Sequence, residues 1–206
     1  MFIIQVRDIV LKTTLCFGLA VSLWLATPLE GSSQTKIISH ETSGNLEVTT
    51  RLECAPVSKL NSSHTPADLY AGVAKCFKEE NYDHATQMFA LAGAYGRFDE
   101  QRVSDTSAHQ AIQVLHMQTF QNINSEMKDK FQDRVREFLS VGAPKLGELC
   151  SEIRKLGAPT YFPWYMIQHG MEAFGPEQPN RGLVPDFSAT EAWAKSLDTY
   201  LHCPVK

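Results

Sequence analysis

The sequence predicts an all-α fold, a single compact domain of about seven helices in which two early helices form a hairpin. Successive segments carry apolar residues three and four positions apart, which is the spacing of one helix face. Short links containing Gly and Pro separate these segments. Only Leu46–Leu52 alternates like a strand, and no second segment of this kind is present to pair with it. With 206 residues, 43% hydrophobic and 20% charged, the chain has the composition of a globular protein.

The first residues have the three-part layout of a secretory signal peptide. Arg7 and Lys12 precede the apolar run Leu15–Ala26, and small or polar residues follow it. The run is shorter than the ~20 apolar residues of a spanning helix, so cleavable export is favoured over a membrane anchor. The expected location is the periplasm, with no membrane insertion after signal cleavage. The expected organisation is a signal peptide at 1–33, an extended polar arm at 34–61 and a helical domain at 62–206.

Four cysteines follow the signal peptide, which contains the fifth, Cys16. An even number in an exported chain predicts two disulfides, for which three pairings are possible. The positions favour Cys54 with Cys76, joining the arm to the first helix, and Cys150 with Cys203, joining the last residues to a later helix. The alternative is four free, buried thiols. A zinc site is not expected, because no two of these cysteines have the C-x2-C spacing of structural zinc sites.

The domain is expected to begin with a helical hairpin between Thr65 and Arg102. Thr65 is a suitable N-cap, Pro66 suits the first helical position, and Asp68 places negative charge in the first turn. The segment 81–83 provides the turn between the two helices. Small side chains allow the helix axes to approach closely; they are Ala71, Gly72, Ala74, Ala85, Ala90, Ala92, Gly93 and Ala94.

This hairpin resembles one unit of a tetratricopeptide or Sel1-type repeat. The residues that carry the resemblance are Leu69, Tyr82, Ala85, Phe89 and Ala92. The match is partial, because Gly72, Val73 and Cys76 stand where the repeat has a Leu-Gly pair and a tyrosine, and Arg97 stands where it has proline. No second copy follows at the ~34-residue period, and solenoids need about three units to bury a core. The hairpin is therefore expected to belong to one globular domain.

Helical patterns continue to the end of the chain. A helix is expected from Asp99 to Asn122, and another begins near Asn124 with an apolar stripe that includes Phe131 and Phe138. A further helix lies between Pro144 and Gly157. Pro163 is expected to begin a central helix that is apolar on most sides, and Ser188 with Glu191 to form the capping box of the last helix.

No motif in the sequence indicates a catalytic reaction. A G-x-S-x-G nucleophile elbow, an H-E-x-x-H zinc motif and a phosphate-binding P-loop are all absent, and no cofactor or metal is expected. The formal net charge is -4 and no run of Lys and Arg occurs, which argues against a nucleic acid or an anionic membrane as partner. The sequence therefore favours a non-enzymatic protein that binds another protein.

A group of polar side chains at the far end of the hairpin is the candidate for partner binding. Arg102, Asp105 and His109 are three and four positions apart, so they can bond to one another along one helix face. The alternative interpretation is a partly buried network that sets the angle between two helices. The whole group consists of Tyr95, Arg97, Asp99, Arg102, Asp105 and His109.

Four sequence runs carry a second resemblance, which covers about Cys54 to Pro204. They are Phe89–Asp99 with Arg102–Ala111, then Tyr165–Gly170, then Tyr200–Cys203. These runs resemble a group of exported proteobacterial proteins that are similar to periplasmic immunity proteins of type VI secretion. The resemblance implies a protein that binds and neutralises a toxic effector, and it assigns no individual binding residue.

Three functions follow as expectations. The first is a periplasmic, non-catalytic immunity protein directed against a toxin that acts on the envelope. The second is an envelope hydrolase with a dispersed active site that uses His109, Asp105 or His169. The third is a structural or chaperone-like factor in envelope assembly. The first has a single protein partner, the second retains a metal or an activity, and the third binds many clients.

Overall fold

The structure, a computed structural model, describes residues 41–203. The predicted signal peptide at 1–33, Cys16 and residues 34–40 of the arm lie outside the described residues. Among residues 41–203 no helix has the length and apolar character that crossing a bilayer requires.

The all-α prediction is confirmed. The described residues contain seven α-helices and four short 3₁₀-helices, and their only strand-like pairing is one bridge between Val103 and Leu183. The α-helices are α1 (Pro66–Lys78), α2 (Tyr82–Arg102), α3 (Gln110–Phe120), α4 (Ser125–Leu139), α5 (Pro144–Leu156), α6 (Trp164–Ile167) and α7 (Ala189–Thr199). The 3₁₀-helices are η1 (Val57–Lys59), η2 (Thr106–His109), η3 (Met171–Phe174) and η4 (Pro179–Gly182).

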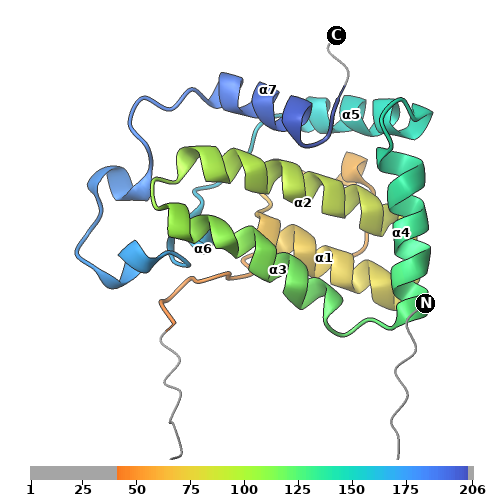
Figure 1. Cartoon of the computed structure of the whole chain (residues 1–206), viewed down its shortest axis with the longest axis horizontal. Helices are drawn as coiled ribbons and strands as arrows, with labels where there is room; N and C mark the ends of the chain where they lie inside the picture. The colour runs from red at the N-terminus through yellow and green to blue at the C-terminus, as the bar shows by residue number, and fades with distance from the viewer. Residues whose placement is uncertain (1–40, 204–206) are drawn as a thin grey trace, which may run out of the picture. The chain divides into compact units, whose positions relative to one another are not determined.

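The antiparallel pair α1 and α2 is the centre of this arrangement. Helix α3 packs on α1, α7 packs on α2, and α4 stands across the end of the pair where α2 begins (Figure 1). Helix α5 packs against α4 and η1. Helices α2 and α3 follow each other in the chain but diverge from their connection, so α4 closes the wide end between them (Figure 1).

The hairpin begins as its sequence predicts. The Thr65 side chain accepts a hydrogen bond from the Asp68 amide at 3.1 Å, and the Asp68 carboxylate accepts one from the Thr65 amide at 2.9 Å. This reciprocal capping box satisfies two backbone groups that the first helical turn leaves without partners. Asn81 caps α2 by accepting a hydrogen bond from the His84 amide.

Small residues bring α1 and α2 close, as expected, since a Cβ at Gly72 would lie 2.1 Å from Cε of Met88. Glycines on α2 also admit neighbours from outside the hairpin. A Cβ at Gly93 would lie 1.9 Å from the Tyr200 hydroxyl, and a Cβ at Gly96 would lie 2.6 Å from Cδ1 of Ile112. Both contacts are possible only with glycine, because real Cβ atoms do not approach other heavy atoms so closely. Gly93 and Gly96 thus allow Tyr200 and Ile112 to pack directly against the α2 backbone.

The arm is fixed to the helices rather than forming a strand. Leu46 donates its amide to the Tyr165 carbonyl at 3.1 Å, and Asp68 accepts hydrogen bonds from the amides of Thr49 and Thr50 at 2.7 and 2.8 Å. Asp68 therefore caps α1 and holds the arm at the same time.

Both predicted disulfides are present. Cys54 is bonded to Cys76 and Cys150 to Cys203, with sequence separations of 22 and 53. The first joins the arm to α1 and the second joins α5 to the residues after α7. The alternative of four free thiols is wrong.

The predicted helix from Asp99 to Asn122 is wrong. Helix α2 continues to Arg102, the chain turns at Val103, and a separate helix begins at Gln110. Val103 has extended backbone angles and pairs with Leu183, and Asp105 accepts the Ser107 amide at 2.8 Å, which starts η2. These side-chain and long-range contacts replace helical hydrogen bonds in a segment whose periodicity alone indicates a continuous helix.

Two smaller predictions also need correction. The helix at Pro163 exists but spans only Trp164–Ile167, because the chain turns at Gly170 into η3. Ser188 is the N-cap of α7, yet its side chain makes no capping hydrogen bond, so the expected box with Glu191 does not form. The starts predicted at Asn124 and Pro144, and the stop at Gly157, are confirmed.

Candidate functional site

Asp99 lies at the centre of a closed polar network. Its side chain is fully buried, and one carboxylate oxygen accepts hydrogen bonds from the Tyr161 hydroxyl at 2.8 Å and the Tyr165 hydroxyl at 2.7 Å. The other oxygen accepts Nε of Arg102 at 2.8 Å, and Nη2 of the same guanidinium lies 2.6 Å away. All these donors point inward, so the network joins α2 to the segment around α6.

Arg102 fills the space beside Asp99 with its planar group. Its guanidinium carbon lies 5.0 Å from the centre of the Phe98 ring and 5.1 Å from that of Tyr161, so both rings stabilise the cation. Burial raises the pKa of Asp99, and Arg102 and the two tyrosine hydroxyls oppose that rise. Burial also raises the pKa values of Tyr161 and Tyr165, which keeps both hydroxyls as donors.

Asp105 forms a second closed site in the turn after α2. One oxygen accepts the amide of Ser107 at 2.8 Å and its hydroxyl at 2.6 Å, and the other accepts the Glu172 amide at 2.9 Å. Burial acts to raise the pKa of Asp105, but these hydrogen bonds and one from the Ala108 amide lower it on balance. A Cβ at Gly170 would lie 2.2 Å from Asp105, so only glycine lets that chain segment approach.

The six candidate binding residues therefore do not form one surface. Tyr95, Asp99, Arg102 and Asp105 are buried, and only Arg97 and a portion of His109 reach the outside. The expected contacts between Arg102 and Asp105, and between Asp105 and His109, do not form. Arg102 turns back to Asp99, and Nε2 of His109 lies 3.0 Å from the Val103 carbonyl oxygen. The buried members match the alternative interpretation, a network that fixes two helices.

The histidines named for catalysis are held by other polar groups. Nδ1 of His169 lies 2.9 Å from the amide oxygen of Asn45, and His109 pairs with a backbone carbonyl. No cluster of three or more His, Cys, Asp or Glu side chains with the geometry of a metal site occurs between residues 41 and 203.

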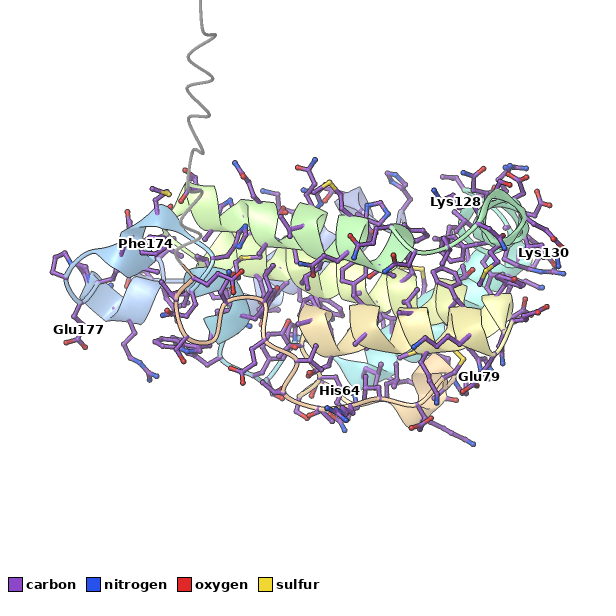
Figure 2. All side chains as sticks on the ribbon, turned by 90° about the horizontal axis from the view of Figure 1, so that it is seen from below. His64, Glu79, Lys128, Lys130, Phe174 and Glu177 are labelled. Atoms are coloured by element: carbon purple, nitrogen blue, oxygen red, sulfur yellow. A yellow bond between two sulfur atoms is a disulfide. The ribbon has the colours of Figure 1, made fainter. Side chains whose placement is uncertain are left out.

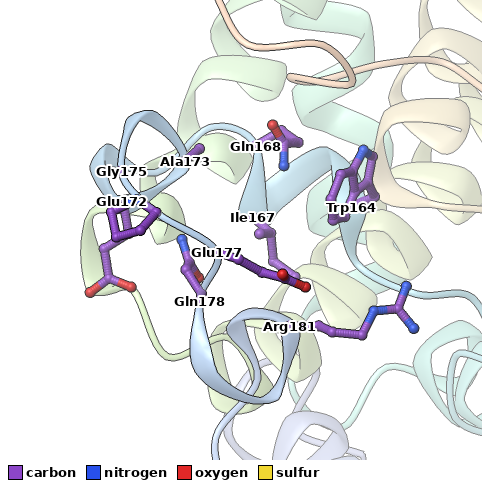
Figure 3. A pocket seen from close by; sticks show the side chains of 10 residues that line it. Trp164, Ile167, Gln168, Glu172, Ala173, Gly175, Glu177, Gln178 and Arg181 are labelled. Atoms are coloured by element: carbon purple, nitrogen blue, oxygen red, sulfur yellow. The ribbon is translucent and has the colours of Figure 1, made fainter.

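A small pocket lies at the end of the molecule opposite α4, near Phe174 and Glu177 (Figure 2). It has a volume of about 190 Å³. The wall on the α6 side contains Trp164, and the loop side contains Glu177 and Arg181 (Figure 3). Its charged rim carries both signs, and Arg181 stacks on Phe162 at 4.3 Å, so this rim gives no consistent charge preference for a ligand.

A longer groove runs between α2 and α3 and continues to α4; we call it the α2–α3–α4 groove. Its polar section has a volume of about 570 Å³, and its aromatic section has a volume of about 430 Å³. The two sections adjoin each other, since Phe89 and His116 line both. The polar section also contains Tyr70, Gly93, Arg97, Glu100, His109, Gln110, Ile112, Gln113 and Tyr200. The aromatic section also contains Phe120, Lys128, Phe131, Gln132, Val135 and Arg136.

The floor of the aromatic section is a cluster of rings from three helices. Phe89 lies edge-on to Phe120 and Phe131, with ring centres 6.0 and 5.5 Å apart. The His116 ring covers Phe120 at 4.8 Å and Phe89 at 5.4 Å. Partial burial against these rings lowers the pKa of His116, so the ring stays neutral at neutral pH.

The polar section is organised around an ion pair on α2. Nη1 of Arg97 lies 2.7 Å from the Glu100 carboxylate, and the guanidinium lies 5.9 Å from the Tyr200 ring centre. Below them is the buried Tyr70, whose pKa is raised first by burial and further by Tyr200 and Glu100, with Arg97 opposing. The charges at this end of the groove are thus largely matched.

Sequence reasoning missed this groove. Arg97 and His109 were singled out and do line it, but Phe89, Phe120 and Phe131 have the spacing of ordinary core positions. The signal that could have revealed it is on α4, where Lys128, Gln132 and Arg136 recur every fourth residue beside an apolar stripe. These residues indicate a groove only once α2 and α3 are known to diverge.

Comparison of the chain with models of protein families, with characterised proteins and with solved structures gave no match.

Proposed function

We propose that the protein is an exported, non-catalytic protein that binds another protein. The observation that carries the proposal is the α2–α3–α4 groove, which combines an open aromatic floor with polar margins on a rigid helical scaffold. Grooves of this kind accept the apolar face of a partner segment. Aromatic and arginine side chains are also the residues that contribute most to protein interfaces.

Two disulfides support export, because such bonds persist in oxidising compartments. They agree with the signal peptide that the sequence predicts. The closed state of Asp99 and Asp105 supports a binding role over a hydrolytic one, since every carboxylate oxygen of these two residues already accepts protein donors. A general base needs an oxygen or nitrogen that can reach the proton it removes.

The specific form of the proposal is immunity against a toxin that acts in the periplasm. Its experiment deletes the gene and exposes the cells to sibling cells that secrete effectors. Deleted cells should lose viability, and the tagged protein should co-purify with one effector. Full resistance of deleted cells, together with no co-purifying effector, would contradict the immunity proposal.

The same purification separates the other candidate functions. Many co-purifying envelope proteins in place of one tight partner would favour an assembly factor. Hydrolysis of peptidoglycan or peptides that is lost in His109→Ala would favour an enzyme.

A further inference from the structure

We propose that the α2–α3–α4 groove binds an acidic, amphipathic helical segment of the partner protein, with apolar side chains on the aromatic floor and carboxylates facing α4. This inference rests on the proposed protein-binding function and adds the surface and the chemistry of the partner. Neither follows from export or from the absence of catalytic motifs.

The dimensions of the groove fit a short helix. Its α2 wall extends from Phe89 to Glu100, which is about 16 Å at 1.5 Å per residue. The α3 wall from Gln110 to Phe120 is about 15 Å long by the same measure. About three turns of a partner helix would cover this distance, with apolar residues at i, i+3, i+4 and i+7 facing the groove and those nearest α4 on the aromatic floor.

The floor favours apolar side chains over a small polar ligand. It is formed mainly by the rings of Phe89, Phe120 and Phe131, with Val135 beside them. The polar groups in the aromatic section, such as Gln132 and Lys128, stand on the margin as exposed residues of α4. An apolar centre with a polar rim is the anatomy of a protein interface.

The margin selects the charge of the partner. The aromatic section is lined by Lys128 and Arg136 and by no acidic residue. Arg136 forms an ion pair with Asp133 at 2.8 Å on the exposed side of α4. Both side chains are about two-thirds exposed, so the pair is screened by solvent. At the other end Arg97 is matched by Glu100. The excess positive charge of the groove therefore lies along α4, on a chain whose formal net charge is -4.

Carboxylates on the partner would meet this basic margin and increase the rate of association by electrostatic steering. A lysine-bearing segment of the same shape would be repelled at the same place. Charge complementarity thus favours an acidic segment of a protein over a neutral or basic one.

The test uses the oxidised protein expressed from the full-length gene and a displayed library of amphipathic helices. The library fixes Leu, Ile or Phe on one face and randomises the residues at its margins. Selection on the wild-type protein should enrich Asp and Glu at the margins. The double variant Lys128→Glu/Arg136→Glu should instead enrich Lys and Arg, and should bind the acidic peptide from the first selection about tenfold more weakly.

Lys130→Glu is the matched control. Lys130 lies on the same helix two residues from Lys128, pairs with Glu126 at 2.7 Å and lines neither section of the groove (Figure 2). It changes the net charge by two units, as Lys128→Glu alone does, and it should select the same acidic peptides as the wild type. A general charge effect would instead weaken binding equally in the two single variants Lys130→Glu and Lys128→Glu.

The outcomes separate this inference from the function on which it rests. Selected peptides with no charge preference, or equal binding to the double variant, would overturn the groove assignment and leave protein binding intact. The groove assignment would also be overturned, with protein binding intact, if the effector found by co-purification binds the wild type and the double variant equally. No enrichment on any variant, and no co-purifying protein, would overturn both.

Discussion

The Asp99 network and the α2–α3–α4 groove contain similar side chains in opposite environments, one closed and one open. Arginine, tyrosine and aromatic rings meet in both, next to the same helix. In the network Nε of Arg102 and the hydroxyls of Tyr161 and Tyr165 donate to one buried carboxylate. In the groove Lys128 and Gln132 stand at the margin of an open aromatic floor. The network is buried within the fold, whereas the groove is open and is the surface proposed to bind a partner. Burial, and not residue type, therefore separates the two roles.

Asp99→Asn should have the largest effect and mark the network as structural. The amide would replace an acceptor oxygen with a donor facing either Arg102 or the tyrosines, and leave the guanidinium without a carboxylate. The free energy of unfolding should fall by about 3–5 kcal/mol, as when a buried pair loses one partner. Urea denaturation measures this. A loss below about 1 kcal/mol would place the network with ordinary surface pairs.

The two disulfides differ in the stability that they are expected to add. In the chain-entropy model the Cys150–Cys203 bond, with a separation of 53, contributes about 4 kcal/mol, and the Cys54–Cys76 bond, with a separation of 22, about 3 kcal/mol. Paired Cys→Ser variants measured by urea denaturation should follow this order. The reverse order would mean that fixing the arm to α1 stabilises the fold more than fixing the end of the chain to α5.

Gly93→Ala should disturb the polar section of the groove without touching the network. The new Cβ would overlap the Tyr200 hydroxyl, so the ring must leave its seat on α2. We expect a loss of about 1–3 kcal/mol, as for overpacked positions. Gly147→Ala is the control, since a Cβ there meets no atom within 4 Å; it should be neutral or stabilising. Equal losses would indicate a general effect of removing helical glycine.

Asp99 and Asp105 should affect the pH dependence of stability with opposite signs. The folded pKa of Asp105 is lowered, so its contribution is present above the unfolded value of about 3.9 and is lost as pH falls through the folded pKa. The folded pKa of Asp99 is raised by burial, so its contribution is present below the unfolded value and is lost as pH rises through the folded pKa.

Unfolding free energies of wild type, Asp105→Asn and Asp99→Asn measured across a pH series would test these signs. Relative to the wild type, Asp105→Asn should lose less stability on acidification below about pH 4. Asp99→Asn should lose less as the pH rises above that value. Differences of the same sign in the two variants would contradict the assignment.

Lys128→Glu should have the smallest effect on stability. The side chain is exposed at the groove margin, and surface changes of this kind stay within about 0.5 kcal/mol. Thermal unfolding of the variant should therefore match that of the wild type. A marked loss of stability would mean that the groove margin supports the fold, and the contrast with the Asp99 network would disappear.

Much of the fold was accessible to sequence reasoning because its signals are local. The capping box at Thr65, the stop at Gly157 and the apolar stripe of α4 each depend on residues within a few positions of one another. The cysteine positions favoured one of three possible disulfide pairings, and that pairing is the one that forms. The helix predicted across Val103 failed because its interruption depends on Leu183, 80 positions further along the chain.

The sequence by itself determined an all-α domain, because helix periodicity is a property of neighbouring residues. The number and positions of the cysteines also favoured the two disulfides that form. Only the tertiary structure decided that Asp99 is closed off while Phe89 and His116 line an open groove. That choice depends on the divergence of α2 and α3 and on the seating of Ile112 and Tyr200 against glycine. Such packing arises between segments far apart in the chain, and a pattern of residue types does not tell how close such segments lie in space.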